Sequence, residues 1–206
     1  MKTCKTKIVR MVSLILVFAL VVSAVSVGAV KAQAKKKKNV VVLYFSATGT
    51  TQGAAKRIKK ATKGKMLAIK AADPYSDADL DYGNDNSRVT KEHESANSPA
   101  ESSVRPKINN LNTIQKAVKK ADVVYIGYPI WWGEAPHIVY NMVENVNLKG
   151  KTVVPFSTSI SSGLGSSGTH LKTKANISAK TKWLKGRNFF DIPSQKTVNK
   201  WVKKIK

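Results

Sequence analysis

Apolar runs of the kind found in buried strands alternate along this chain with stretches in which apolar residues recur every three or four positions. Three runs, at 40–45, 122–128 and 152–157, are rich in Val, Ile and aromatic residues, as strands buried on both faces usually are. Shorter apolar stretches at 66–72 and 183–190 predict two more strands, the second at a sheet edge. The pattern therefore predicts five strands.

Helical spacing is found between these strands. It predicts helices that begin near residue 52, at 111–120, at 137–145, at 166–174 and after Ser194. The last is the clearest, because Ser194 is a good N-cap and Val198, Trp201, Val202 and Ile205 fall at i, i+3, i+4 and i+7. Strands that alternate with helices predict an α/β fold with a parallel sheet covered on both faces.

The segment 73–105 interrupts this alternation. It is polar and rich in aspartate, and only a short helix around 87–96 is expected within it. Structureless loops longer than about 12–15 residues are uncommon in compact domains and usually signal function or mobility. We therefore expect this segment to act near a binding site, where it could close a second pocket.

Residues 1–34 have the three parts of a secretory signal peptide. A basic head (1–10) precedes an uncharged apolar stretch (11–30), and Ala32-Gln33-Ala34 supplies the small-x-small cleavage site. About 20 apolar residues also suffice to span a bilayer, so an uncleaved N-terminal anchor is the alternative. Residues 35–38 then form a basic linker, and 39–206 form one domain. Both readings place that domain outside the cytoplasm, either secreted or associated with the membrane or cell wall.

The chain is strongly basic, with 36 Lys and Arg against 12 Asp and Glu. Without residues 1–34, which hold five basic and no acidic residues, the net charge falls from +24 to +19. Such a field attracts an anionic membrane or cell-wall surface. The lysines are dispersed and no nucleic-acid module is recognisable, so no specific nucleic-acid partner is expected. A solvated surface adapted to an anionic envelope is the simpler interpretation.

Three loops follow the three central strands, and in a parallel sheet they meet at the edge where ligands bind. The first, 46–51, has the sequence Ser-Ala-Thr-Gly-Thr-Thr and precedes a helix. Unpaired N–H groups and the positive end of the helix dipole suit a phosphate there, and the hydroxyls add donors. The loop has neither the lysine of a Walker loop nor the three glycines of a dinucleotide fingerprint. An ordinary capped helix is the alternative.

The other two loops suit a planar ring. The loop 129–136, with Tyr128 just before it, offers Tyr128, Trp131 and Trp132, which can stack on an aromatic ligand, and 157–165 is rich in hydroxyls and glycine. One phosphate and one large ring describe flavin mononucleotide (FMN). Other chemistry is less supported, since the three histidines are scattered and no Gly-x-Ser-x-Gly elbow is present. Cys4, the sole cysteine, lies in the basic head.

These three motifs together resemble the flavodoxin-like family, and in particular its branch with the Tyr-Pro-Ile-Trp-Trp loop. The resemblance covers roughly residues 39–204. It implies a doubly wound sandwich with a five-stranded parallel sheet in the order 2-1-3-4-5, and bound FMN. By position, the cofactor-binding residues would be Ser46, Thr48, Gly49, Thr50, Thr51, Tyr128, Pro129, Ile130, Trp131, Trp132, Gly133, Ser157, Thr158, Ser159 and Gly163. Either Trp131 or Trp132 is expected to stack on the flavin.

The resemblance implies a redox protein that transfers electrons through FMN, with no protein residue as catalyst and no metal, and the pattern of residues 1–34 adds that it is exported. Familiar flavodoxins are acidic and cytoplasmic, so it supports FMN more firmly than it supports any partner, and the electron donor and acceptor stay unknown. An NAD(P)H- or quinone-dependent flavin oxidoreductase is one alternative. A flavin-binding or envelope interaction module without redox use is another. Turnover with a quinone or dye would separate these classes.

Overall fold

The computed structural model describes residues 37–205. The predicted signal peptide or anchor, and the first half of the predicted basic linker, lie outside the described residues. One compact unit begins at Lys38. Its core residues all lie between Val41 and Trp201, so a chain that starts at residue 35 keeps every described core contact.

The sheet is parallel throughout, in the order β2-β1-β3-β4-β5, with β6 also paired to β4. Its strands are β1 (Val40–Tyr44), β2 (Lys65–Ala68), β3 (Val123–Pro129), β4 (Thr152–Thr158), β5 (Lys182–Trp183) and β6 (Arg187–Phe189). The predicted order is thereby confirmed.

The fifth strand position is divided between two short strands, where the sequence pattern predicts a single edge strand. β5 pairs with the start of β4 and β6 with its end, which leaves Pro155 opposite the gap. Proline has no N–H to give to a ladder, and a strand beside it usually bulges or ends. Gly186 occupies the gap at φ 77°, with its Cα so close to the Pro155 carbonyl that a Cβ would collide with it.

The predicted helices are all present, with ends shifted by a few residues. They are α2 (Thr50–Thr62), α4 (Leu111–Lys119), α5 (His137–Asn145), α6 (Ser167–Lys174) and α7 (Gln195–Val202). Ser194 caps α7 as expected, since its hydroxyl accepts from the Thr197 N–H. The segment 73–105 is more ordered than a loop: it contains a 3₁₀ turn, η2 (Ala78–Leu80), and the short helix α3 (Arg88–Glu94).

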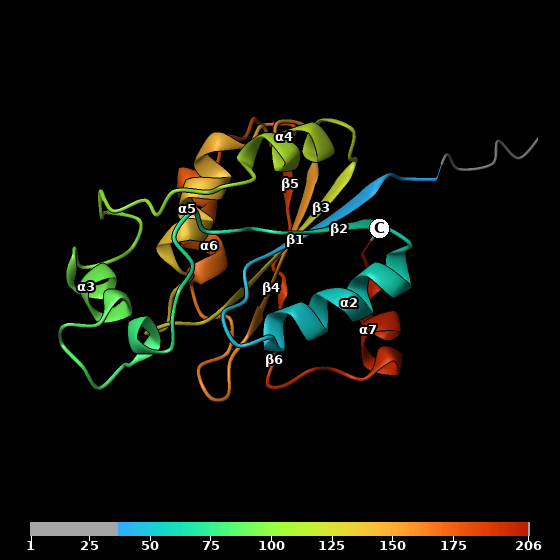
Figure 1. The fold of residues 1–206 in the computed structure, drawn as a ribbon. Helices are drawn as coiled ribbons and strands as arrows, with labels where there is room; N and C mark the ends of the chain where they lie inside the picture. Colours follow the sequence, from blue (N-terminus) through green and yellow to red (C-terminus); the bar gives the residue numbers. More distant parts are fainter. Residues whose placement is uncertain (1–36, 206) are drawn as a thin grey trace, which may run out of the picture. The chain divides into compact units, whose positions relative to one another are not determined.

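Alternate strand residues face two core layers, one on each side of the sheet. In β1, Val41 and Leu43 join the cluster under α4, α5 and α6, while Val42 and Tyr44 join the cluster under α2 and α7. Figure 1 shows these two helical layers on opposite sides of the strands, with η2 and α3 extending beyond one end of the sheet. Burial on both faces explains why the central strands are apolar without alternation.

No helix within the described residues is both long and apolar enough to cross a bilayer.

Gly127 in β3 provides a direct test of the core packing. A Cβ at this position would collide with the ring of Phe156, which is fully buried in the neighbouring strand. Because a close-packed interior gives way only at a cost, we expect Gly127→Ala to lower the free energy of unfolding by about 1–3 kcal/mol. Chemical denaturation would measure the loss.

Gly83→Ala is the matched control, since its nearest neighbour would be the Asp81 Oδ1 atom at an ordinary 3.5 Å. We expect it to change the free energy of unfolding by less than about 0.5 kcal/mol. Equal effects of the two substitutions would contradict the described contact between Gly127 and Phe156.

His137, the first residue of α5, should make stability depend on pH. The side chain is buried, which together with nearby Arg105 and His93 lowers its pKa from 6.5 to about 4. Since the unfolded chain then binds the proton more readily, stability is retained above pH 6.5 and falls as the pH drops toward 4. We expect wild type to lose roughly 1–2 kcal/mol more than His137→Gln between pH 7 and pH 5. Parallel denaturation curves for both proteins at the two pH values measure this; identical losses would contradict it.

Candidate functional site

The turn between β1 and α2 leaves the helix N-terminus open. Gly49, the N-cap residue, adopts φ 93°, and no side chain caps the helix. The Ser46 hydroxyl instead accepts from the Gly49 N–H at 3.1 Å, which closes the turn. The first helical N–H groups therefore keep their capacity to bind an anion, and the hydroxyls of Thr48 and Thr50 lie on the same loop.

A buried hydrogen bond joins this first loop to the third. The hydroxyl oxygens of Thr51 and Thr158 lie 2.7 Å apart, and both side chains are buried. Thr158 is the last residue of β4, and its carbonyl accepts from the Ile130 N–H at 3.0 Å. The three loops are thus fixed to one another through Thr158.

The second loop contains a tight turn from Trp131 to Glu134. These two residues exchange backbone hydrogen bonds of 2.9 Å in both directions. The two central residues, Trp132 and Gly133, have φ 46° and 80°, as a type I′ turn requires. Positive φ is unfavourable for tryptophan, so the turn depends on contacts of its side chain.

The two tryptophans of this turn have different environments. Trp131 packs edge-on against Phe45 and Tyr75, with ring centroids 5.6 and 5.4 Å away. Trp132 is 39% exposed and stacks in parallel on His93 of α3 at 4.5 Å. The ring centroid of Tyr82 lies 4.7 Å from that of Trp132. Only Trp131 of the pair belongs to the wall of the cavity described next.

A cavity of about 400 Å³ opens where the three loops meet. Of the predicted site residues, nine line it: Ser46, Thr48, Thr50, Thr51, Pro129, Ile130, Trp131, Thr158 and Ser159. The other six, Gly49, Tyr128, Trp132, Gly133, Ser157 and Gly163, are not part of its wall.

The six residues outside the wall have structural contacts instead. Tyr128 is buried and its hydroxyl lies 3.1 Å from that of Ser167, while the buried Ser157 donates to Asn188 Oδ1 at 2.8 Å. Gly49, Gly133 and Gly163 adopt positive φ, so each allows its loop to turn. Sequence position places these residues near the site, but it does not determine which of them face the cavity.

The cavity wall also contains seven residues that are not among the fifteen predicted site residues. Ala47, Ile160, Ser161 and Ser162 belong to the predicted loops 46–51 and 157–165, while Leu80, Tyr82 and Phe190 lie outside all three loops. Tyr82, Ile160 and Phe190 are large and exposed, at 50%, 92% and 65% of their surface. Leu80 and Tyr82 come from the segment 73–105, whose length was the only signal of a role at the site. Tyr82 and Phe190 belong to no motif, and only the tertiary structure places them here.

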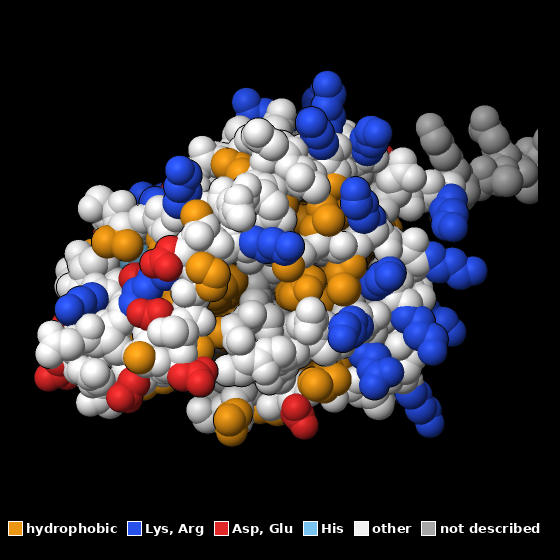
Figure 2. Space-filling model, viewed as in Figure 1, with side chains coloured by type: hydrophobic (Ala, Val, Ile, Leu, Met, Phe, Trp, Pro, Cys, Tyr) orange, Lys and Arg blue, Asp and Glu red, His pale blue; other side chains and the backbone are white. Residues whose placement is uncertain are grey.

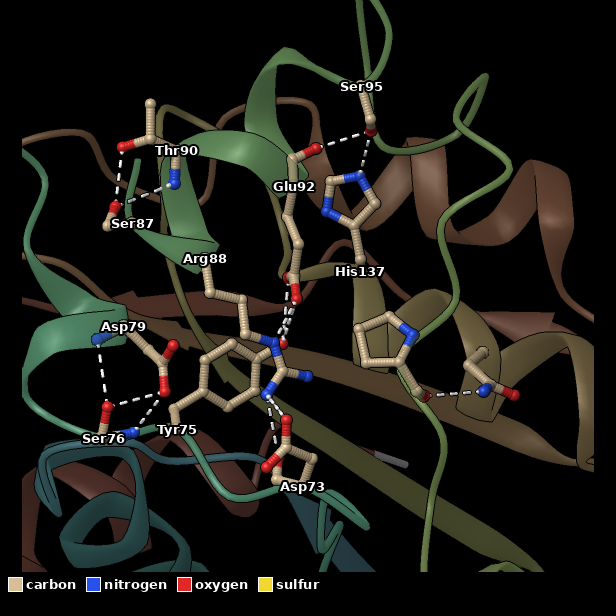
Figure 3. Close-up of polar contacts among 12 residues, drawn as sticks. Asp73, Tyr75, Ser76, Asp79, Ser87, Arg88, Thr90, Glu92, Ser95 and His137 are labelled. Carbon is tan, nitrogen blue, oxygen red and sulfur yellow. Dashed lines mark hydrogen bonds and ion pairs between the residues drawn. The ribbon is translucent and has the colours of Figure 1, made fainter. Parts of the chain in front are cut away.

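The segment 73–105 is held beside the cavity by a partly buried polar network (Figure 3). The Tyr75 hydroxyl donates to the Glu92 carboxylate at 2.9 Å, and Arg88 Nε donates to the same carboxylate at 2.9 Å. The Arg88 guanidinium also covers the Tyr75 ring at 3.9 Å, and its Nη1 donates to the Asp73 carbonyl. Because Tyr75 packs against Trp131, this network supports the cavity wall from behind.

Burial changes the acidity of groups in and behind this wall. It raises the pKa of Tyr82 to about 12 and raises the pKa of the Glu92 carboxyl. The pKa of Tyr75 is raised by burial and by the neighbouring Glu92. Both phenols are therefore neutral at physiological pH, and the neutral Tyr75 hydroxyl keeps the proton that it donates to Glu92.

A second anchor holds the far end of the segment. Arg105 makes a bidentate ion pair with Glu144 of α5, at 2.8 Å for both bonds, and Arg105 Nη1 also donates to three carbonyl groups at 99–104. Bidentate arginine–carboxylate pairs are among the stronger polar contacts in proteins. Both ends of the segment are thus attached to the body of the domain.

The chemistry of the cavity wall is neutral. Its lining residues include no Asp, Glu, Lys, Arg or His, and no cluster of metal-ligating side chains is found within the described residues. The wall offers hydroxyls, helix N–H groups and an indole. These groups are suited to holding a phosphate by neutral donors and to covering a planar ring.

Comparison with known proteins agrees with this geometry. The family model Flavodoxin_4, which describes flavodoxins, matches residues 38–205. A search among curated proteins found no match. Solved structures do match. A protein from Bacteroides eggerthii, assigned as a flavoprotein, is 39% identical with a TM-score of 0.67, over 82% of this chain and 98% of that one.

Two further structures are similar. A Bacteroides uniformis protein with the same assignment is 34% identical, with a TM-score of 0.67 over 82% of this chain and 99% of its own. A flavoprotein from Lactobacillus acidophilus, solved in complex with FMN, is 18% identical, with a TM-score of 0.51 over 80% and 99%, which shows a shared fold. By the family match and by these two Bacteroides relatives, the chain belongs to the flavodoxin family.

Proposed function

We propose that this protein is an exported redox protein that binds FMN in the 400 Å³ cavity and transfers electrons through it. The observation that carries the proposal is the uncapped N-terminus of α2, which opens onto an uncharged cavity walled by Trp131. Such a site matches a ligand with one phosphate and one planar ring. FMN in the Lactobacillus acidophilus relative adds support.

The residues present fit FMN in two parts. The phosphate would be held by the helix N–H groups together with the hydroxyls of Thr48 and Thr50, while Trp131 would cover the ring. Bound flavin supplies the capacity to take up and release electrons, and the protein supplies binding and orientation. Tyr82, Ile160 and Phe190, which are exposed and line the cavity, would limit the access of water to the ring.

The extracytoplasmic location remains a proposal that depends on the basic, apolar and small-x-small pattern of residues 1–34. The electron donor and acceptor are not identified by any described residue.

The first experiment measures FMN binding by a chain that begins at residue 35. We expect the absorbance bands of flavin to remain with the protein after desalting and to bleach on anaerobic addition of dithionite. FMN should bind at least about tenfold more tightly than riboflavin, because only FMN carries the phosphate that the helix N-terminus accepts.

The double variant Thr48→Ala, Thr50→Ala sharpens this test. It should weaken FMN binding at least about fivefold and change riboflavin binding little, since only phosphate donors are lost. Thr113→Ala, at an exposed position of α4, is the control and should leave both affinities unchanged. A colourless protein after desalting, or equal affinity for FMN and riboflavin, would contradict the proposed phosphate site.

The two tryptophans make a second, independent prediction. Trp131→Leu should weaken the binding of both FMN and riboflavin at least about threefold. The substitution removes ring stacking, which contributes about 0.5–1.5 kcal/mol beyond area burial. Trp132→Leu, whose ring stacks on His93 outside the wall, should have a smaller effect. Fluorescence titration would measure both, with denaturation curves to confirm folding. A larger loss for Trp132→Leu would reverse the assignment.

A further inference from the structure

Acidic and basic side chains gather at opposite ends of the strands. Eight of the twelve acidic residues lie in the segment 73–105, which has only three basic residues and therefore a net charge of −5. The rest of the described chain, 37–72 and 106–205, holds 25 basic and four acidic residues. Figure 2 shows acidic side chains gathered over η2 and α3, and basic side chains over α4, α7 and the end of α2.

The basic residues concentrate at the edge of the sheet opposite the cavity. The strand register brings the starts of β2, β3, β4 and β5 into one row, and lysines begin two of these strands, at Lys65 and Lys182. Lys120 and Lys149 precede the other two. Crossover helices run antiparallel to the strands, so they end at this edge as well.

Those helix ends are also basic. α2, α4, α6 and α7 each have one or two lysines in the last turn, and α2, α4 and α7 have a lysine as C-cap. Favourable contact with the helix dipole explains lysines in these positions. It does not explain Lys65, Lys149 or Lys182, which belong to strand starts and a turn rather than to helix ends.

These lysines have no acidic partners in the structure. The ion pairs among the described residues involve Arg88, Arg105 and His170, and none includes a lysine. The row from β2 to β5 spans about 19 Å at the usual strand spacing. An exposed cationic surface of this width fits a broad anionic surface better than a single small anion.

We propose that this row, the basic edge (Lys65, Lys120, Lys149 and Lys182 with the adjacent helix ends), docks on an anionic lipid bilayer and directs the cavity away from it. Repulsion of the acidic segment 73–105 from the same surface favours this orientation, because that segment borders the cavity at the opposite edge. Each lysine close to such a surface contributes measurably to binding.

The sequence before the basic edge favours a bilayer over a soluble polymer. β1 begins at Val40 of this edge, one residue after the four lysines at 35–38, and the apolar stretch 11–30 precedes them in the sequence. Where that stretch is retained, it suits a bilayer and not a polyanion in solution. The proposal does not depend on FMN, since the basic edge and the cavity lie at opposite ends of the strands.

The test measures binding of the chain from residue 35 to vesicles of phosphatidylcholine, with or without roughly one-third phosphatidylglycerol, in about 0.1 M salt, where screening extends over about 10 Å. One variant changes Lys65, Lys120, Lys149 and Lys182 to Gln. The control changes four exposed lysines outside the edge, Lys70, Lys91, Lys107 and Lys196, to Gln. Both variants lose the same net charge.

We expect tight binding only to the anionic vesicles. The edge variant should bind at least about tenfold more weakly and the control less than about threefold more weakly. Equal weakening by both variants, or equal binding to neutral vesicles, would overturn the proposal. Binding to polyphosphate that depends on the edge lysines, without binding to vesicles, would overturn the choice of a bilayer.

Orientation is tested with single cysteines, because the chain from residue 35 has none. Ala179→Cys places a fluorophore at the basic edge, and Ser161→Cys places one at the cavity mouth. Nitroxide lipid headgroups should quench the first label at least about threefold more than the second. Quenching of both labels alike would show that the protein binds without a preferred orientation.

Discussion

Burial of the central strands on both faces is the constraint on which the rest of the structure depends. β1, β3 and β4 are covered by α2 and α7 on one side and by α4, α5 and α6 on the other, so each connection must cross a face of the sheet. The strands are parallel, and the loops that follow them therefore converge at one edge. Three short segments, separated by up to about a hundred residues, meet at one cavity for that reason.

Two local interactions give that edge its chemistry. The hydrogen bond between Thr51 and Thr158 connects the first and third loops, and the aromatic cluster of Phe45, Tyr75 and Trp131 supports the second. Gly49 leaves the start of α2 uncapped within this frame. In our proposal, this neutral cavity with free N–H groups takes a ligand that brings its own charge and its own reactive ring.

The opposite edge of the sheet has the opposite character. Helices that end there place lysines in their last turns, and strand starts add more, while most acidic residues lie beyond the other edge. The two ends of the strands thus have separate tasks in our proposals, with docking at one and cofactor binding at the other. One parallel sheet can provide a docking surface and a cofactor site, because every strand starts at one of these edges and ends at the other. The helices run the opposite way, so their C-termini and N-termini are separated in the same manner.

The sequence by itself determined the class of fold, the five central helices and the three loops, because burial on both faces and helical spacing are local patterns. It also indicated a candidate phosphate loop, since Ser, Thr and Gly between a strand and a helix have a local physical meaning. Only the tertiary structure decided that Trp131, and not Trp132, lines the cavity and that Tyr82 and Phe190 complete its wall. Only the tertiary structure showed that the fifth strand divides opposite Pro155. These outcomes depend on contacts between residues far apart in the chain, such as the stacking of His93 on Trp132, which no local pattern encodes.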